Sequence, residues 1–96
     1  MIKASKVSSN DNIAILLEDI SKGEVCEYGA GNKQKANQDI PFGHKIALID
    51  INTGEDIIKY GHIIGYATQP IKQGDLVHNH NIRSDRGRMK KERPVE

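Results

Sequence analysis

Four segments of this chain share one form, an isoleucine followed after two residues by a glycine and a polar residue. They occupy residues 20–24, 40–44, 51–55 and 71–75. Glycine tolerates the positive φ angles of tight turns, so each segment is predicted to be a turn. A constant shift that moves Gly23 onto Gly54 also moves Gly43 onto Gly74. This spacing predicts an internal duplication. A chain of 96 residues is too short for a tandem solenoid, so we expect two pseudo-symmetric halves that fold together.

The segments between these turns are short and rich in β-branched or aromatic residues. Such segments, separated by Gly, Pro, Asn and Asp, are typical of β-strands. They lie at residues 13–17, 46–49, 56–60, 63–67 and 76–80. Gly61-His62 is predicted to be the tight turn of a hairpin. Because no segment shows a sustained helical period, we predict a small all-β domain.

Two polar stretches are expected to lie outside the strands. Residues 29–39 contain no large apolar side chain and are predicted to form a mobile loop that adds nothing to the core. Residues 83–96 hold six Lys and Arg against three Asp and Glu, whereas residues 1–82 hold eight against ten. We therefore predict a folded domain over residues 1–82 and a basic flexible tail or docking segment over residues 83–96.

The composition excludes several classes of protein. Cys26 is the only cysteine, so an intrachain disulfide is excluded and a structural thiol is expected. No apolar run reaches the roughly 18 to 20 residues that span a bilayer, and we expect a cytoplasmic protein without a membrane partner. The basic tail lacks interleaved aromatic residues, which argues against nucleic acid. A small core with apolar strands makes a homo-oligomer or a heteromer plausible.

Four histidines and one lysine are the residues that suggest chemistry. If residues 76–80 form a strand, His78 and His80 face the same side and could share a metal or a carboxylate, although a solvated strand end has the same pattern. His44 and Lys45 could hold an anion between a ring N–H and an ammonium group, although both also suit a turn and a strand flank. His62, near the predicted hairpin tip, is expected to be structural or functionally neutral. No phosphate-binding loop, carboxylate pair or Ser/His/Asp signature is present.

Several of these segments taken together resemble a known family. Residues 11–20, 43–51, 57–61, 64–67 and 74–81 are similar, in the same order, to the N-terminal SAF domain of the altronate dehydratase family. This family includes altronate and galactarate dehydratases and sulfolactate sulfo-lyases, in which the domain is either fused to a large catalytic region or encoded as a small subunit. The resemblance, which covers roughly residues 11 to 82, implies a compact β-clip fold.

The resemblance also implies an activity and a set of site residues. The activity is that of a lyase that removes water from a sugar acid and forms a 2-keto-3-deoxy acid, with iron(II) or manganese(II) as cofactor. By matching positions, His44 and Lys45 are expected to be catalytic and to bind the substrate carboxylate. Asn81 is expected to bind substrate, and His78 and His80 are expected to face the metal.

The chain is shorter than a whole dehydratase. We therefore expect a small subunit that acts with a separate large catalytic subunit and is inactive alone. Two alternatives remain open at this point: the small subunit of a sulfolactate sulfo-lyase, and a stand-alone SAF-type module that binds a carbohydrate acid without catalysis. The Gly-His-Lys turn and the His-x-His-Asn segment favour an enzyme subunit.

Overall fold

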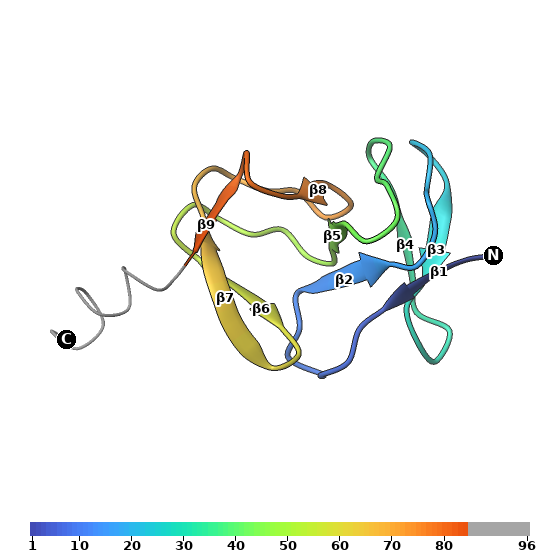
Figure 1. The fold of residues 1–96 in the computed structure, drawn as a ribbon, viewed down its shortest axis with the longest axis horizontal. Helices are drawn as coiled ribbons and strands as arrows, with labels where there is room; N and C mark the ends of the chain where they lie inside the picture. Colours follow the sequence, from blue (N-terminus) through green and yellow to red (C-terminus); the bar gives the residue numbers. More distant parts are fainter. Residues whose placement is uncertain (85–96) are drawn as a thin grey trace, which may run out of the picture.

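The computed structural model describes residues 1–84, which form nine short β-strands and no helix (Figure 1). The predicted all-β class is confirmed. The strands are β1 (Ile2–Ser5), β2 (Ile13–Leu16), β3 (Val25–Glu27), β4 (Lys33–Lys35), β5 (Lys45–Ala47), β6 (Asp56–Lys59), β7 (His62–Ala67), β8 (Leu76–Val77) and β9 (Ile82–Ser84). Within residues 1–84 there is accordingly no helix that could cross a membrane.

The strands form two sheets. A six-stranded sheet has the order β4-β3-β1-β2-β5-β8, and a three-stranded sheet has the order β6-β7-β9. All pairs are antiparallel except β1 with β3. In Figure 1 the three-stranded sheet lies at one end of the domain, β1, β3 and β4 lie at the other end, and β2 and β5 run between them. The candidate residues near β5 and β8 therefore lie at one edge of the larger sheet.

Hydrogen bonds confirm the predicted internal duplication. Ile20 and Ile40 exchange two backbone hydrogen bonds, and their counterparts Ile51 and Ile71 do the same in the second half. The pairing of β2 with β5 recurs in register as that of β5 with β8, and the pairing of β3 with β4 recurs as that of β6 with β7 up to a register shift between Ile57 and Ile58. The glycines of all four turns have φ between +86° and +96°, as the sequence predicts.

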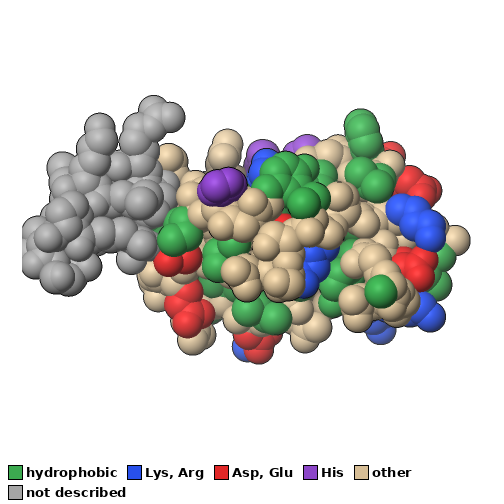
Figure 2. Space-filling view, turned by 90° about the horizontal axis from the view of Figure 1, so that it is seen from below, with side chains coloured by type: hydrophobic (Ala, Val, Ile, Leu, Met, Phe, Trp, Pro, Cys, Tyr) green, Lys and Arg blue, Asp and Glu red, His purple; other side chains and the backbone are tan. Residues whose placement is uncertain are grey.

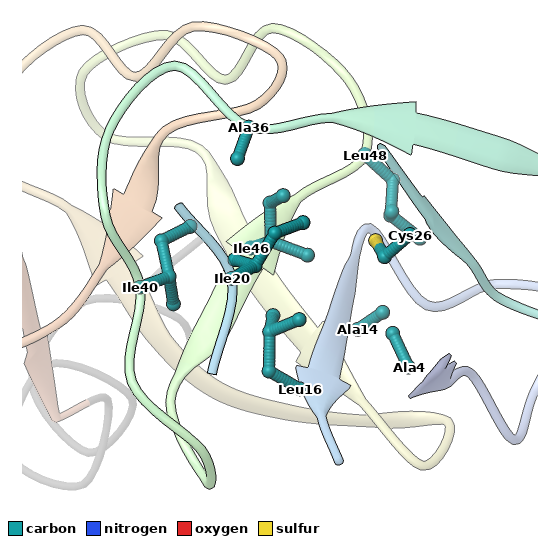
Figure 3. Packing of buried hydrophobic residues seen from close by; sticks show 9 residues of the cluster. All are labelled: Ala4, Ala14, Leu16, Ile20, Cys26, Ala36, Ile40, Ile46 and Leu48. Atoms are coloured by element: carbon teal, nitrogen blue, oxygen red, sulfur yellow. The ribbon is translucent and has the colours of Figure 1, made fainter. Parts of the chain in front are cut away.

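Each half has its own hydrophobic core, and the two cores correspond. The first contains Leu16, Ile20, Cys26, Ala36, Ile40 and Ile46 together with Ala4, Ala14 and Leu48, and Figure 3 shows all nine side chains between the strands. The second contains, at the six equivalent positions and in the same order, Ala47, Ile51, Ile57, Ala67, Ile71 and Val77, together with Ile13. The thiol of Cys26 is fully buried, and burial raises its pKa, which confirms a structural role.

The prediction for residues 29–39 was wrong. Lys33–Lys35 form β4, which pairs with β3, and Ala36 is buried in the first core. Its contribution to the core is a methyl group, as is that of the equivalent residue Ala67 in the second core. Gln34 is also buried, and its carboxamide oxygen accepts a hydrogen bond from Gln73 Nε2 at 2.9 Å.

Three smaller predictions were also wrong or incomplete. No local pattern predicted β1, which is short and has only one buried residue, Ala4. The hairpin turn between β6 and β7 is centred on Tyr60-Gly61, one residue earlier than predicted, and both residues have positive φ. Arg83 and Ser84 belong to β9 and not to a tail, because they pair with β7. The rest of the predicted tail, residues 85–96, lies outside the described residues.

One buried carboxylate connects the first turn of the chain to the β6–β7 hairpin. Asp11 Oδ2 accepts hydrogen bonds from the backbone N–H groups of Ser8 at 3.0 Å and Val7 at 3.3 Å, while Oδ1 accepts one from Gly61 at 2.8 Å. Burial alone would raise the pKa of Asp11, but the backbone donors, Gly61 foremost, outweigh it and hold the pKa below its ordinary value.

We expect Asp11→Asn to lower the free energy of unfolding by about 1–3 kcal/mol, because an amide cannot accept all three bonds with the strength of a carboxylate. Since the folded-state pKa is depressed, this stabilisation is present above the ordinary pKa and is lost as the pH falls through the folded-state pKa. Urea denaturation of both proteins between pH 7 and pH 2 measures it. A difference in stability that stays constant over this range would contradict an ionic role.

Candidate functional site

The pairing of β5 with β8 brings two of the candidate histidines together. Lys45 pairs with Val77, so the next positions along the two strands, His44 and His78, face each other. Their ring centroids are 4.7 Å apart and the ring planes are tilted by 50°. Two residues far apart in the sequence therefore form one imidazole pair at the edge of the sheet. Figure 2 shows histidine side chains near one border of the molecule, beside a basic side chain and apolar side chains.

Lys45, the next residue along the chain from His44, is a partly buried cation close enough to act on His78. Its side chain is half-buried on β5, between Ile15 of β2 and Val77 of β8. Burial, and secondly repulsion from Lys59, hold the pKa of Lys45 below its ordinary value. Within residues 1–84 the only ion pair joins Lys3 and Glu27, so no described carboxylate neutralises Lys45. The fold thus keeps an uncompensated ammonium group partly out of water.

The electrostatics of His78 show that these groups act on one another. Burial foremost, followed by the charges of His44, Lys45 and His80, holds the pKa of His78 below its ordinary value. An imidazole and an ammonium group that disfavour each other's charge are stabilised together by a bound anion. The cluster of His44, Lys45 and His78, hereafter the basic cluster, is therefore suited to bind an anionic group.

The structure places His80 differently from the sequence prediction. The strand β8 ends at Val77, and residues 78–81 form a turn closed by a hydrogen bond from Asn81 N to His78 O at 3.0 Å. The expected alternation along a strand therefore does not apply to His78 and His80. His80 is exposed and close enough to His78 to lower its pKa. Its role as a metal ligand stays a prediction.

Asn81 is buried and supports the turn that carries His78. Its Oδ1 accepts a hydrogen bond from His78 N at 2.9 Å, and its Nδ2 donates one to Leu76 O at 2.9 Å. The side chain thus fixes the backbone on both sides of Val77. It holds the backbone of His78, whose ring contacts that of His44. A direct contact between Asn81 and substrate stays a prediction.

The donor groups in the described part of the chain are not sufficient for a metal site. Within residues 1–84 no three His, Cys, Asp or Glu side chains are arranged to hold a metal ion. His44 and His78 supply two imidazole nitrogens close together, whereas protein metal sites ordinarily use three or four protein ligands. These residues therefore do not fit a complete metal centre, and any metal needs ligands from elsewhere.

Sequence reasoning missed one member of this environment. Lys59 lies on β6, well beyond Lys45 in the sequence, and its charge contributes to the low pKa of Lys45. The proximity arises because β2, the neighbour of β5, packs against β6 of the other sheet. No local pattern in the sequence carries that information.

Comparisons with known proteins give a consistent result. Residues 2–85 match the altronate/galactarate dehydratase SAF domain. The chain is 42% identical over 81 residues to "Altronate dehydratase" of Bacillus subtilis, a match that covers 83% of this chain and 16% of that protein. It is 47% identical over 47 residues to "(2R)-sulfolactate sulfo-lyase subunit alpha" of Chromohalobacter salexigens, covering 49% of this chain and 50% of that subunit. The subunit of the same name from Paracoccus pantotrophus is 41% identical over 51 residues, covering 53% of this chain and 76% of that subunit. The chain thus spans about one sixth of the Bacillus subtilis protein.

We expect Lys45→Met to raise the free energy of unfolding, because an apolar side chain of similar length removes a partly buried charge and its repulsion from Lys59. The folded-state pKa of Lys45 is lowered, so the penalty is complete below that pKa and is relieved as the pH rises through it toward the ordinary value of 10.5. The advantage of the variant should therefore be largest at neutral pH and decrease above it.

Urea denaturation between pH 7 and pH 10.5 measures this difference, and Lys72→Met is the matched control. Lys72 is exposed at the turn 71–75, so its replacement should change stability by less than about 0.5 kcal/mol. A Lys45→Met protein that is less stable than the wild type at neutral pH would show that the charge is compensated.

Proposed function

Because this chain belongs to the altronate/galactarate dehydratase SAF-domain family, we propose that it is the small subunit of a sugar-acid dehydratase and acts with a separate large catalytic subunit. Relatives that are named dehydratases or lyases support a lyase. The finer assignment to an altronate-type enzyme is supported by two matches of 42% identity that each cover 83% of this chain.

The observation that carries this proposal is the uncompensated charge of the basic cluster. In the proposed complex the ammonium group of Lys45 pairs with the carboxylate of the sugar acid, and the ring N–H of His44 donates a second, charge-assisted hydrogen bond. Lys45 lies on β5, and the contact with His78 restrains the ring of His44. Restraint of this ring lowers the side-chain ordering cost when the substrate binds.

The same residues have a role in the proposed reaction. A proton leaves the carbon next to the carboxylate, the β-hydroxyl group leaves with a proton as water, and the resulting enol becomes the ketone of a 2-keto-3-deoxy acid. Negative charge moves onto the carboxylate as the first proton leaves. Lys45 stabilises that charge because its ammonium group is partly removed from water. His44, half-buried at the same carboxylate, is proposed to move one of the protons.

Iron(II) or manganese(II) is the proposed cofactor, held mainly by the large subunit, because residues 1–84 lack a group of three ligands. When bound, such an ion polarises the hydroxyl and carboxylate oxygens of the substrate. From this chain, His78 and His80 remain the proposed contributors of ligands. The residues of this chain are otherwise assigned to binding and orienting the acid.

A sulfolactate sulfo-lyase is the second candidate, favoured by one observation. The match to the Paracoccus pantotrophus sulfo-lyase subunit covers 76% of that subunit, which supports a role as a subunit for this chain too. A binding module without catalysis would use the same basic cluster. Substrate preference and activity separate these three candidates.

Titration with altronate, followed by two-dimensional amide NMR, tests the binding step. We expect shifts for residues 44–46 and 76–80. Lys45→Met should weaken binding about tenfold or more, which corresponds to loss of a charge-assisted hydrogen bond. Lys72→Met, on an exposed lysine, should bind as the wild type does. Parallel titrations with galactarate and sulfolactate rank the candidates. Equal weakening by both lysine variants would contradict a specific site.

Catalysis requires a second experiment, with this chain isolated under native conditions from its own cells. We expect the preparation to contain a larger protein and to convert altronate, with added manganese(II), into a 2-keto acid. The recombinant chain alone should be inactive, and a preparation carrying Lys45→Met should lose most of the activity. If the chain alone is as active as the isolated complex, the two-subunit proposal is wrong. If neither is active on any of the three acids, the lyase proposal is wrong.

A further inference from the structure

Three of the four glycine turns are closed by a carboxylate that follows the glycine. Here the turn is counted from the residue after the isoleucine, so that the glycine is the third residue and the polar residue the fourth. In each of the three turns, the side chain of the fourth residue accepts a hydrogen bond from the backbone N–H of the first. The pairs are Ser21 N to Glu24 Oε1 at 2.8 Å, Asn52 N to Glu55 Oε1 at 2.7 Å, and Lys72 N to Asp75 Oδ2 at 2.9 Å. The carboxylate at this position is therefore a structural feature of the repeated turn.

The remaining turn, at residues 41–44, lacks both the donor and the acceptor of this hydrogen bond. Pro41 stands at the first position and has no N–H to donate. His44 stands at the last position, where the other turns have Glu or Asp. Its counterpart in the second half is the turn from Lys72 to Asp75, which keeps the bond. Donor and acceptor are thus absent together.

The rest of the turn at residues 41–44 is unchanged. His44 N still donates to Pro41 O at 3.1 Å, and Gly43 has a positive φ like the other turn glycines. Phe42 N donates to Asp19 Oδ1 at 2.8 Å, as Gln73 N does to Asp50 Oδ1 at 2.8 Å. The turn therefore lacks only the hydrogen bond between the side chain at position 44 and the backbone at position 41. Its imidazole contacts His78 and approaches Phe42 O at 3.4 Å, which is too long for a strong hydrogen bond.

A carboxylate at position 44 would be incompatible with an anion site at the basic cluster. It would lie next to Lys45 in the chain and opposite His78, so it would neutralise the charge that attracts the ligand and repel the ligand itself. A backbone N–H at position 41 would in turn donate to a ring nitrogen of His44 and hold the ring against the turn, away from the ligand. Proline at position 41 and histidine at position 44 are therefore both needed for an anion site at this turn.

From this we infer that Pro41 is a positioning residue of the basic cluster: by removing the N–H that binds a carboxylate in the other three turns, it frees position 44 for an imidazole that faces the ligand. The part of this inference that concerns the ligand rests on the proposed function. The part that concerns the turn does not, since it follows from the hydrogen bonds of the four turns alone.

A double-mutant cycle tests the coupling between the two positions. Pro41→Asn and His44→Glu, singly and together, give this turn the residues of the turn at 52 and 55 and add no charge at position 41. We expect His44→Glu to lower the unfolding equilibrium constant about tenfold more in the Pro41→Asn background than in the wild type, because only there does the carboxylate gain an N–H donor. Electrostatic effects of the new carboxylate on Lys45 and His78 occur in both backgrounds and cancel. An equal effect in both backgrounds overturns the inference.

The turn 51–55 provides the matched control. Glu55→Gln should destabilise the wild type but have a much smaller effect in an Asn52→Pro background, since proline removes the donor that Glu55 accepts from. Proline at the equivalent position 41 shows that this turn can hold it. If Glu55→Gln costs the same stability in both backgrounds, the carboxylate does not act through this bond and the inference fails.

Titration of the same proteins with altronate gives a readout that a purely structural role would not change. Pro41→Asn alone should weaken binding about threefold, because the restored N–H can donate to a ring nitrogen of His44 and hold the ring against the turn, and His44→Glu should abolish binding in both backgrounds. Unchanged affinity of Pro41→Asn overturns the positioning role. If the wild type binds none of the three acids, the proposed function fails, whereas the double-mutant cycle still decides whether Pro41 and His44 are coupled.

Discussion

The structure depends on glycine turns that hydrogen-bond to each other in pairs, one pair in each half. Ile20 and Ile40 exchange two backbone hydrogen bonds, and Ile51 and Ile71 exchange two more in the second half. The positive φ of each turn glycine directs its N–H toward a neighbouring strand, as when Gly23 donates to Ala36 O, and the chain reverses direction there. The isoleucines of these turns are also buried in the two cores. The paired turns therefore determine both the path of the chain and the packing of the core.

The candidate site follows from the repetition of this unit. The facing pair of His44 and His78 occupies the register that Ile13 and Ala47 occupy in the equivalent pair of strands, β2 and β5. Ile13 and Ala47 are buried because further strands flank them, whereas β8 is the edge of its sheet. A position that is apolar core in one copy is therefore at the surface in the other, where imidazoles are tolerated and a ligand can reach them.

The site is formed at the expense of local stability. Lys45 is partly buried without a described partner, and the turn before it lacks the carboxylate bond of the other three turns. A position with only a structural role would have a carboxylate partner for the lysine and a carboxylate that closes the turn. An anionic ligand would compensate for both, because it would neutralise Lys45 and accept a hydrogen bond from His44. These groups therefore support the assignment of the basic cluster to binding a carboxylate.

The sequence by itself determined the local features of this protein. The four glycines, their spacing and the β-branched segments predicted the turns, the all-β class and the duplication, because turn geometry and strand preference depend on neighbouring residues. Tertiary structure decided the rest. It placed Ala36 in the core, ended β8 before His80, directed the side chain of Asn81 to the backbone, and brought Lys59 near Lys45. Those outcomes depend on which strands pack together and on the space left between them, and residues far apart in the sequence set that space.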